Sequence, residues 1–429
     1  MRLIDEIFRA AESLADETEI LYASSESIGA DLKQDKIAIG SKSRSSGLII
    51  RVITSGKIGV SCTDNPDSWK QCLTAALASA KFADPIDWKG LPSPSDIDQK
   101  PLAYDDRLTL NPGLVTDLIE RLKTGSEAHS ADITSGSASV AWSEHTIANS
   151  HGLHYTAKGT QTHVSLEMIA GQSTGYESDS SWNLDQIHPE KTGEDAAFFA
   201  AKGQGGEEIQ TGTYDVILSP VAISQLLGAA IVPALSGRNV HTGRSLFAGK
   251  IGESVAGETI SLIDDPMDPR GVANCAWDGE GMPVKPLKFI ENGILKSFAY
   301  DLRTAYRYGE TPTASAVRAG QSGAPAIGNQ NLILKGPESD VLAEKGIFVH
   351  DLIGAHTANP MSGDFSVELS SPFFASDGEL QQPIRTGMIS GNIFDILHKI
   401  TGCSTEARTL GSMIIPSVRL SGITVIGRG

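Results

Sequence analysis

Histidine is the residue through which this sequence could most directly bind a catalytic metal, and the chain contains ten of them. Zinc peptidases commonly use two histidines on one face of a helix, in a His-Glu-x-x-His pattern, and this pattern is absent from the sequence. His151 and His154 lie in a segment with strand character, where residues at this spacing face opposite sides of a sheet. Together with the neighbouring His145 and His163, they predict polar positions on a strand surface rather than a metal site.

Two further patterns could support hydrolysis or cation binding. Gly171–Gly175 reads Gly-Gln-Ser-Thr-Gly, the spacing of a serine nucleophile on a turn between a strand and a helix. The residues that follow, Tyr176–Trp182, are polar and unlike a helix, so the sequence favours a polar, turn-rich segment over Gly171–Lys191. Asp264–Asp268 gathers three carboxylates but lacks the glycine and the terminal glutamate of a calcium loop, which favours a solvated turn.

The segment from Gly354 to Ser366 is the densest candidate for a binding surface. It reads Gly-Ala-His-Thr-Ala-Asn-Pro-Met-Ser-Gly-Asp-Phe-Ser, with hydrogen-bonding side chains at almost every second position. Asn359-Pro360 and Ser362-Gly363 are turn-forming pairs, and strand-like segments flank the loop on both sides. Two interpretations stay equally open at this point: an ordered structural loop, or one wall of a binding cleft.

Length, charge and cysteine content limit the classes of protein to which the chain could belong. The 429 residues predict two domains, and a net charge of −17 argues against nucleic acid or an anionic membrane as a partner. The four cysteines are scattered, which predicts a reducing compartment. Asp5 and Glu6 lie where a signal peptide needs an apolar run, and the longest apolar stretch is too short to cross a bilayer. We therefore expect a cytoplasmic protein.

The elements that must position these residues mix helices and strands without regular alternation. Helices are expected at 2–16, 68–83, from Asn111-Pro112 onward, and at 194–202, 219–232, 301–308 and 392–400. Pro233 should break or kink the helix that precedes it. Strands are expected at 19–23, 36–39, 47–54, 57–60, within 134–170, and at 214–218, 260–263, 347–352 and 365–369, with a hairpin over 287–298.

This order of elements predicts an α+β fold with two domains rather than a doubly wound parallel sheet. The N-terminal domain, residues 1–205, should mix helices and strands. The C-terminal domain, residues 206–429, should be rich in strands with few helices. The boundary falls at a Gly-Gln-Gly-Gly segment, which is typical of a linker.

Four segments that occur in order along the chain resemble the TldD/PmbA family, on its PmbA side, which is also called TldE. They are Asn149-Ser150-x-Gly152, Phe289–Leu295, Asn359–Ser366 and Ile389–Asn392. The resemblance implies kinship with TldD-type zinc metallopeptidases. In those chains a His-Glu-x-x-x-His sequence on a helix and a cysteine near the C-terminus form the metal site, and the glutamate acts as general base on the zinc-bound water. PmbA-type chains are implied to pair with a TldD-type chain in a heterodimer that trims peptides.

The positions that match the metal motif carry no metal-binding side chain in this sequence. The two histidine positions correspond to Gly228 and Pro233, the glutamate position to Ala229, and the cysteine position to Ser412. A catalytic zinc needs three protein ligands and an open position, which these residues do not supply. We therefore expect no catalytic residue and no cofactor in this chain, and zinc in a TldD-type partner.

The sequence thus predicts a non-catalytic partner subunit of a TldD/TldE-like zinc metallopeptidase complex that trims peptides, with a homodimer possible when it is alone. Two alternatives stay open: a self-sufficient metallopeptidase with other ligands, taken from His151, His154, His241 or His356, and a homodimeric peptide-binding or regulatory module. By resemblance, the candidates for contact with a peptide in the cleft are Asn149, Asn292, Asn359, Asp364 and Asn392. The glycines expected to form structural turns are Gly152, Gly293, Gly363 and Gly391.

Overall fold

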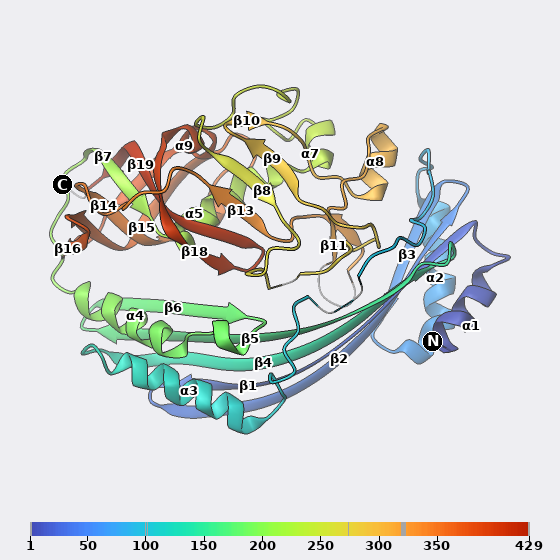
Figure 1. The fold of residues 1–429 in the computed structure, drawn as a ribbon, viewed down its shortest axis with the longest axis horizontal. Coiled ribbons are helices and arrows are strands. Elements are labelled where there is room, and N and C mark those ends of the chain that lie inside the picture. Colours follow the sequence, from blue (N-terminus) through green and yellow to red (C-terminus); the bar gives the residue numbers. More distant parts are fainter. Residues whose placement is uncertain (1, 99, 101, 273, 319–322, 428–429) are drawn as a thin grey trace.

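The computed structural model describes residues 2–98, 100, 102–272, 274–318 and 323–427. Long antiparallel strands from the first half of the chain form a six-stranded sheet in the order β3-β2-β1-β4-β5-β6. Figure 1 shows this sheet as a curved layer below the second half of the chain. Its strands are β1 (Glu17–Lys33), β2 (Lys36–Thr54), β3 (Lys57–Thr63), β4 (Asp132–Asn149), β5 (His154–Ala170) and β6 (Ser173–Ser181).

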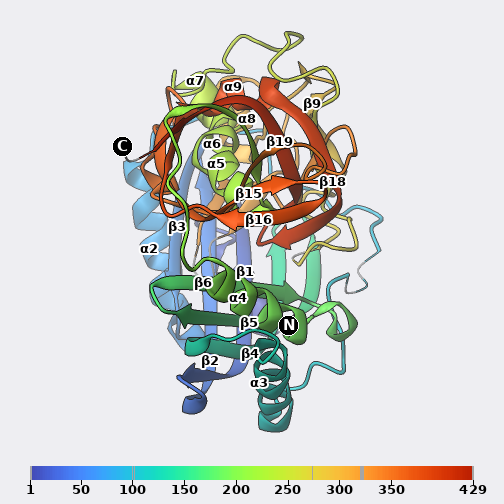
Figure 2. The same cartoon turned by 90° about the vertical axis from the view of Figure 1, so that its left-hand side faces the viewer.

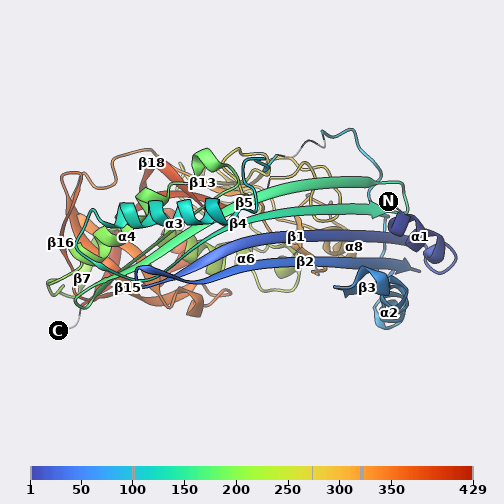
Figure 3. The ribbon, with the colours of Figure 1, turned by 90° about the horizontal axis from the view of Figure 1, so that it is seen from below.

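Two pairs of helices cover different ends of this first sheet, as Figure 3 shows from below. The helices are α1 (Arg2–Ala11), α2 (Trp69–Phe82), α3 (Pro112–Ser126) and α4 (Pro189–Lys202). The start of α3 follows the predicted chemistry, because the side chain of Asn111 accepts a hydrogen bond from the Gly113 amide and Pro112 occupies the first turn. Each pair buries an apolar face: α1 and α2 pack near β1–β3, and α3 and α4 pack near β1 and β4–β6.

The second half of the chain forms a mixed eleven-stranded sheet and a separate pair of short strands. The sheet contains β7 (Gly212–Leu218), β8 (Ser261–Asp264), β9 (Leu287–Glu291), β10 (Ile294–Leu295), β13 (Leu332–Lys335), β14 (Gly346–Ile353), β15 (Asp364–Ser376), β16 (Glu379–Pro383), β17 (Met388–Asn392), β18 (Ile400–Leu410) and β19 (Met413–Ile426). The separate pair is β11 (Ala316–Arg318) with β12 (Pro325–Ile327). The α+β prediction is confirmed, whereas the division at residue 205 stays a prediction.

A helical segment runs through the middle of this second half (Figure 2). It consists of α5 (Pro220–Leu226), a π-helical turn (Leu227–Ile231) and α6 (Val232–Ala234). Its side chains belong to the largest apolar core of the described chain. The other helices of this half are α7 (Gly237–His241), α8 (Leu302–Tyr308) and α9 (Ile393–Lys399), and short 3-10 turns lie at Pro66–Ser68, Leu184–Gln186 and Ala355–Thr357.

Several elements differ from the expectation. The strands predicted at 36–39 and 47–54 are parts of the single strand β2. The segment from Gly171 to Lys191, expected to be turn-rich, contains β6 and the start of α4. Both misreadings arise from serine-rich, polar strands, which lack the apolar alternation on which strand prediction depends. In the described part of the chain, no helix is both long and apolar enough to cross a membrane.

Buried ion pairs join the two halves. Arg51 on β2 donates to Glu19 on β1 at 2.5 Å and to Glu280, which belongs to the loop between β8 and β9. Arg318 of β11 also reaches Glu19 at 2.5 Å, and the second oxygen of Glu280 accepts the Leu302 amide at 2.7 Å. Burial disfavours the charge on Arg51, but Glu19 and Glu280 raise its pKa, so the guanidinium stays ionised. We call Glu19, Arg51, Glu280 and Arg318 the ionic cluster.

The ionic cluster should be essential for stability. Arg51→Met leaves the carboxylates of Glu19 and Glu280 buried without their main partner, so the free energy of unfolding should fall by about 3–5 kcal/mol. Arg44→Met is the matched control, because Arg44 pairs with Glu26 on the surface and should contribute no more than about 1 kcal/mol. Urea unfolding of both variants measures the difference. Equal unfolding midpoints for the two variants would refute this role of the cluster.

Candidate functional site

Three of the four positions that match the metal motif lie on the central helical segment: Gly228 and Ala229 in its π-helical turn and Pro233 in α6 directly after it. Ser219 caps the start of this segment, with its hydroxyl accepting the Ala222 amide at 3.2 Å. Pro233 has no amide hydrogen, and in a regular helix its ring would collide with the carbonyl of residue 229. The helix widens one turn earlier, where the Val232 amide bonds to the Leu227 carbonyl in the i to i+5 pattern. The chain thus continues through Pro233 instead of ending before it.

A cavity of about 470 Å³ opens over the first two of these positions. One wall is the helical segment at Gly228 and Ala229, and the other is the start of the loop that joins β14 to β15, including Ala355 and His356. The full lining is Gln225, Gly228, Ala229, Leu352, Ala355, His356, Ala358 and Pro360. The structure therefore brings the motif positions together with the first part of the Gly354–Ser366 loop. Sequence reasoning did not predict this contact, and it gave no signal for Gln225.

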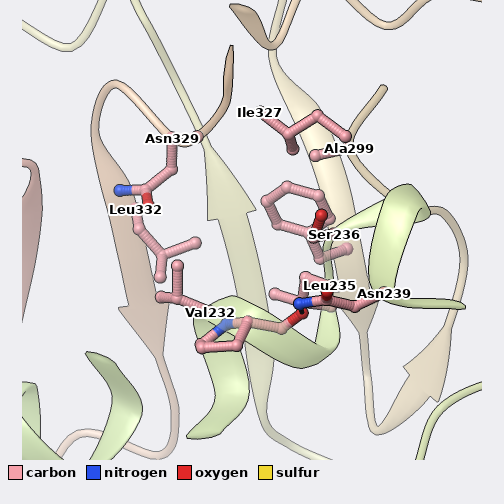
Figure 4. A pocket seen from close by; sticks show the side chains of 11 residues that line it. Val232, Leu235, Ser236, Asn239, Ala299, Ile327, Asn329 and Leu332 are labelled. Carbon is pink, nitrogen blue, oxygen red and sulfur yellow. Dashed lines mark hydrogen bonds between the residues drawn. The ribbon is translucent and has the colours of Figure 1, made fainter. Parts of the chain in front are cut away.

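A second cavity, of about 250 Å³, lies at the third motif position, and Figure 4 shows its walls. Val232 lies at its floor, and Asn329 and Leu332 face Ala299 and Ile327 across it. Pro233 also belongs to the lining. The lining is mainly apolar, with polar side chains contributed by Ser236, Asn239 and Asn329. The side-chain amide of Asn239 donates a hydrogen bond to the Pro233 carbonyl at 2.8 Å, which fixes Asn239 to the helical segment. The cavity can accept a small apolar group with a polar edge.

Ser412, at the expected cysteine position, lies beside the second cavity. The Asn329 side chain donates to the Ser412 carbonyl at 2.7 Å and to its hydroxyl at 3.0 Å. The next residue, Met413, approaches the first histidine position: a Cβ atom on Gly228 would lie 3.5 Å from its methyl carbon. The motif positions thus gather in space, as a shared site requires. The match of Ser412 to the cysteine position stays a prediction.

These residues do not fit a zinc ion. Glycine, alanine and proline offer no side-chain donor, and serine is not among the usual zinc ligands. Within the described residues, no group of three histidine, cysteine, aspartate or glutamate side chains is arranged to hold a metal. We therefore derive no metal-dependent step for this chain.

The remaining candidates in the Gly354–Ser366 loop form a hydrogen-bond network with the end of β17. The side-chain oxygen of Asn359 accepts hydrogen bonds from the backbone amides of Met361 and Ser362, at 2.9 and 3.2 Å. Asn392 donates to the Ser362 carbonyl at 2.7 Å and to the Asp364 carboxylate at 2.9 Å, while its oxygen caps α9. The hydrogen bonds from Asn392 and Ser362 lower the pKa of Asp364. The loop is therefore rigidly shaped, and the exposed Asp364 keeps a charged edge toward solvent.

Of the predicted turn glycines near this network, Gly363 forms a turn, whereas Gly391 lies inside strand β17 and not in a turn. Gly363 has φ +79°, and its amide donates to the Asn359 carbonyl at 2.8 Å. A Cβ atom there would lie 2.4 Å from the Phe394 ring, so only glycine fits without a shift. Gly391 pairs with Phe365 between β17 and β15, and a Cβ atom there would meet that ring at an ordinary 3.4 Å.

The other candidates lie elsewhere and make no hydrogen bond to this loop within the described chain. Asn149 is buried in the turn between β4 and β5, where it donates to the Pro92 carbonyl at 2.8 Å and accepts the His151 amide at 2.9 Å. Gly152 in that turn has φ +88°. Asn292 and Gly293 form the tight turn between β9 and β10, with φ +50° and +78°. These residues share the role of shaping turns, and the structure does not gather them into one site with Asn359.

Family models match most of the chain. The PmbA/TldA metallopeptidase domain 1 matches residues 18–80, the central domain residues 110–203, and the C-terminal domain residues 211–427. This chain belongs to the TldD/PmbA family. It is similar to TldE from Thermococcus kodakarensis, whose crystal structure superposes with a TM-score of 0.91 at 27% identity over 99% of this chain and 100% of that one. The family assignment, on the PmbA/TldE side, is confirmed.

Curated relatives agree with this placement. A protein of Methanocaldococcus jannaschii, described as uncharacterized, is 28% identical over 426 residues, covering 98% of this chain and 99% of its own. A protein of Escherichia coli O157:H7 named metalloprotease PmbA is 23% identical over 389 residues, covering 85% and 83% of the two chains. The PmbA/TldE-type pattern therefore extends through both halves of the molecule.

Four of the histidines lie in different surroundings, and within the described residues none belongs to a group of three side chains that could hold a metal. Burial and the nearby Arg318 lower the pKa of His145, and burial lowers that of His163. His151 lies 3.5 Å from Glu17, and His241 stacks on Tyr308 with its Nε2 3.2 Å from the Tyr300 hydroxyl. Gly171–Gly175 forms the β5–β6 hairpin, so its serine does not lie between a strand and a helix.

Two glycine-to-alanine substitutions compare a position where the fold requires glycine with one where it should tolerate alanine. Gly363→Ala should lower the free energy of unfolding by about 2–4 kcal/mol, from the positive φ and the contact with Phe394. Gly228→Ala meets only Met413 at ordinary distance, so its stability should stay within about 1 kcal/mol of wild type. Urea midpoints measure both changes, and a Gly228→Ala loss as large as that of Gly363→Ala would contradict this account.

Proposed function

We propose that this PmbA/TldE-type chain is the non-catalytic partner subunit of a TldD-type zinc metallopeptidase and helps to hold the peptide that the partner cleaves. One observation carries the proposal. The motif positions meet in space around Gly228, Pro233 and Ser412, yet none of them offers a zinc ligand or a general base. In this proposal the zinc belongs to the partner.

The cavities beside the motif positions support a role in peptide binding. The cavity at Pro233 is mainly apolar, which suits a side chain of a peptide, and the polar atoms of Asn239 and Asn329 lie where a peptide group could bond. The cavity at Gly228 adjoins the rigid loop that ends at Asp364. We assign peptide contact to these two cavities and to the exposed edge of Asp364. Asn149, Asn292, Asn359 and Asn392 remain candidates of the same kind, although the first three already lie in turns and Asn392 caps α9.

The proposal predicts how metal and activity divide between the two chains. This chain, purified alone, should hold far less than one zinc per molecule and cleave no peptide, whereas a mixture with a TldD-type chain should form a complex that cleaves. Metal analysis, size-exclusion chromatography and a peptide-cleavage assay measure these outcomes. Stoichiometric zinc with cleavage by this chain alone would favour the self-sufficient peptidase. A stable homodimer that does not bind the TldD-type chain would favour a separate binding or regulatory module.

A matched pair of substitutions tests which chain contributes the general base. Ala229→Gln in this chain should leave kcat of the complex within about threefold of wild type at saturating peptide, because position 229 takes no part in water activation, whereas KM should rise because residue 229 lines a cavity assigned to the peptide. The same glutamine placed at the motif glutamate of the TldD-type chain should abolish cleavage. A large loss of kcat from Ala229→Gln at saturating peptide, with complex formation intact, would show that this chain participates in the chemical step.

A further inference from the structure

One edge of the first sheet is left open over part of its length. β2 pairs with β1 along almost its whole length, from Lys36 to Ile53, but it pairs with β3 only from Leu48 to Thr54. Figure 3 shows β3 and α2 confined to the end of β2 that lies near α1. The residues between Gly40 and Ser45 are exposed. This stretch, which we call the open edge, is long enough for roughly 20 Å of added strand.

The pairing registers show which backbone groups of the open edge lack a partner. Thr54 and Lys57 flank the two-residue turn Ser55-Gly56, so they form a hydrogen-bonded pair, and even-numbered residues of β2 point their amides toward β3. Odd-numbered residues therefore bond to β1, and the irregularity near Leu32 lies beyond the stretch in question. The amides and carbonyls of Gly40, Lys42 and Arg44 point outward, and no hydrogen bond to them is made within the described chain.

The charge of the open edge is opposite to that of the molecule. Lys33, Lys36, Lys42 and Arg44 lie on or beside it, with Asp35 as the one carboxylate between positions 33 and 46, while the whole chain carries −17. Of these cations, only Arg44 has an ion-pair partner in the described structure, namely Glu26 at 3.2 Å. Like charges that face each other across paired strands are destabilising, and opposite charges are stabilising. The edge thus disfavours a strand of its own kind and favours an acidic one.

We propose that the open edge of β2 is a docking site for an acidic, extended segment of a partner protein, which adds to the sheet as a further strand. Main-chain hydrogen bonds to Gly40, Lys42 and Arg44 supply the pairing, as in other cases of strand addition. The lysine and arginine side chains select for glutamate or aspartate on the incoming strand. A second copy of this chain is not the occupant, because its own open edge carries the same positive charge.

The direct test uses the full chain and two capped peptides of about eight residues, one alternating threonine with glutamate and one alternating threonine with lysine. The acidic peptide should slow amide hydrogen exchange within residues 40–46 by about tenfold or more, and the basic peptide should not. Binding, followed by calorimetry, should weaken as salt is added. Absence of protection at millimolar acidic peptide, or equal protection by both peptides, would overturn the proposal.

Substitutions at one residue separate the backbone from the side chain. Lys42→Pro removes the outward amide hydrogen without removing a bond to β1, and proline is tolerated at strand edges, so peptide affinity should fall about tenfold or more. Lys42→Ala keeps the amide and should lose only the part of the affinity that depends on charge. Equal affinity for Lys42→Pro and Lys42→Ala would contradict strand addition.

A charge reversal keeps the proposal testable if Lys42→Pro fails to fold. The double variant Lys42→Glu with Arg44→Glu retains every backbone group. Its affinity for the acidic peptide should fall, and its affinity for the basic peptide should rise. Retained preference for the acidic peptide would refute the assignment of the charges. These outcomes do not depend on the proposed peptidase role, because metal content and cleavage by the complex are measured with other reagents and on other residues.

Discussion

The two halves of the molecule keep one arrangement because charges from both are buried together. Arg51 and Glu19 from the first sheet meet Glu280 and Arg318 from the second half, where Arg51, Glu19 and Glu280 are each no more than 2% exposed. A buried charge without its partner costs several kcal/mol, so the cluster forms only when both halves are in place. At the other end, Glu177 of β6 binds Arg408 of β18 at 2.7 Å and His350 of β14 at 3.3 Å. Two separated contacts of this kind resist both sliding and rotation of the halves.

Much of the architecture follows from local chemistry that the sequence displays. The cap at Asn111, the turn at Asn292-Gly293 and the helix that begins after Asp301 were predictable, because each depends on a side chain acting on its own neighbours. β6 was not predictable, because its alternation buries Glu177 rather than an apolar residue. That carboxylate is acceptable inside because the Arg408 guanidinium, far away in the sequence, pairs with it, and the His350 ring lies 3.3 Å from it.

At the candidate site, too, contacts between residues distant in the sequence could not be predicted. The residue types at Gly228, Ala229 and Pro233 could be read from the sequence, and so could the polar character of the Gly354–Ser366 loop. Their adjacency could not, because it depends on the packing of the central helical segment against β14 and the Ala355–Thr357 turn. The sequence left open whether the Gly354–Ser366 loop is a structural loop or a cleft wall. In the structure one part of the loop lines a cavity, and hydrogen bonds of Asn359 and Asn392 shape another part, so both descriptions apply.

The cavities remain although the motif positions bear no ligands, and the core explains why. Leu226, Leu227, Ala230 and Ile231 are fully buried, so the axis of the helical segment is fixed by packing on the side away from the cavities. Small residues at positions 228 and 229 therefore leave space that the backbone cannot move to fill, and Met413 approaches only one side of it. The π-helical turn contributes as well, because it carries the chain through Pro233 without a break. With Gly228 and Ala229 on this helical segment, the cavity stays open rather than collapsed, as the proposed contact with a peptide requires.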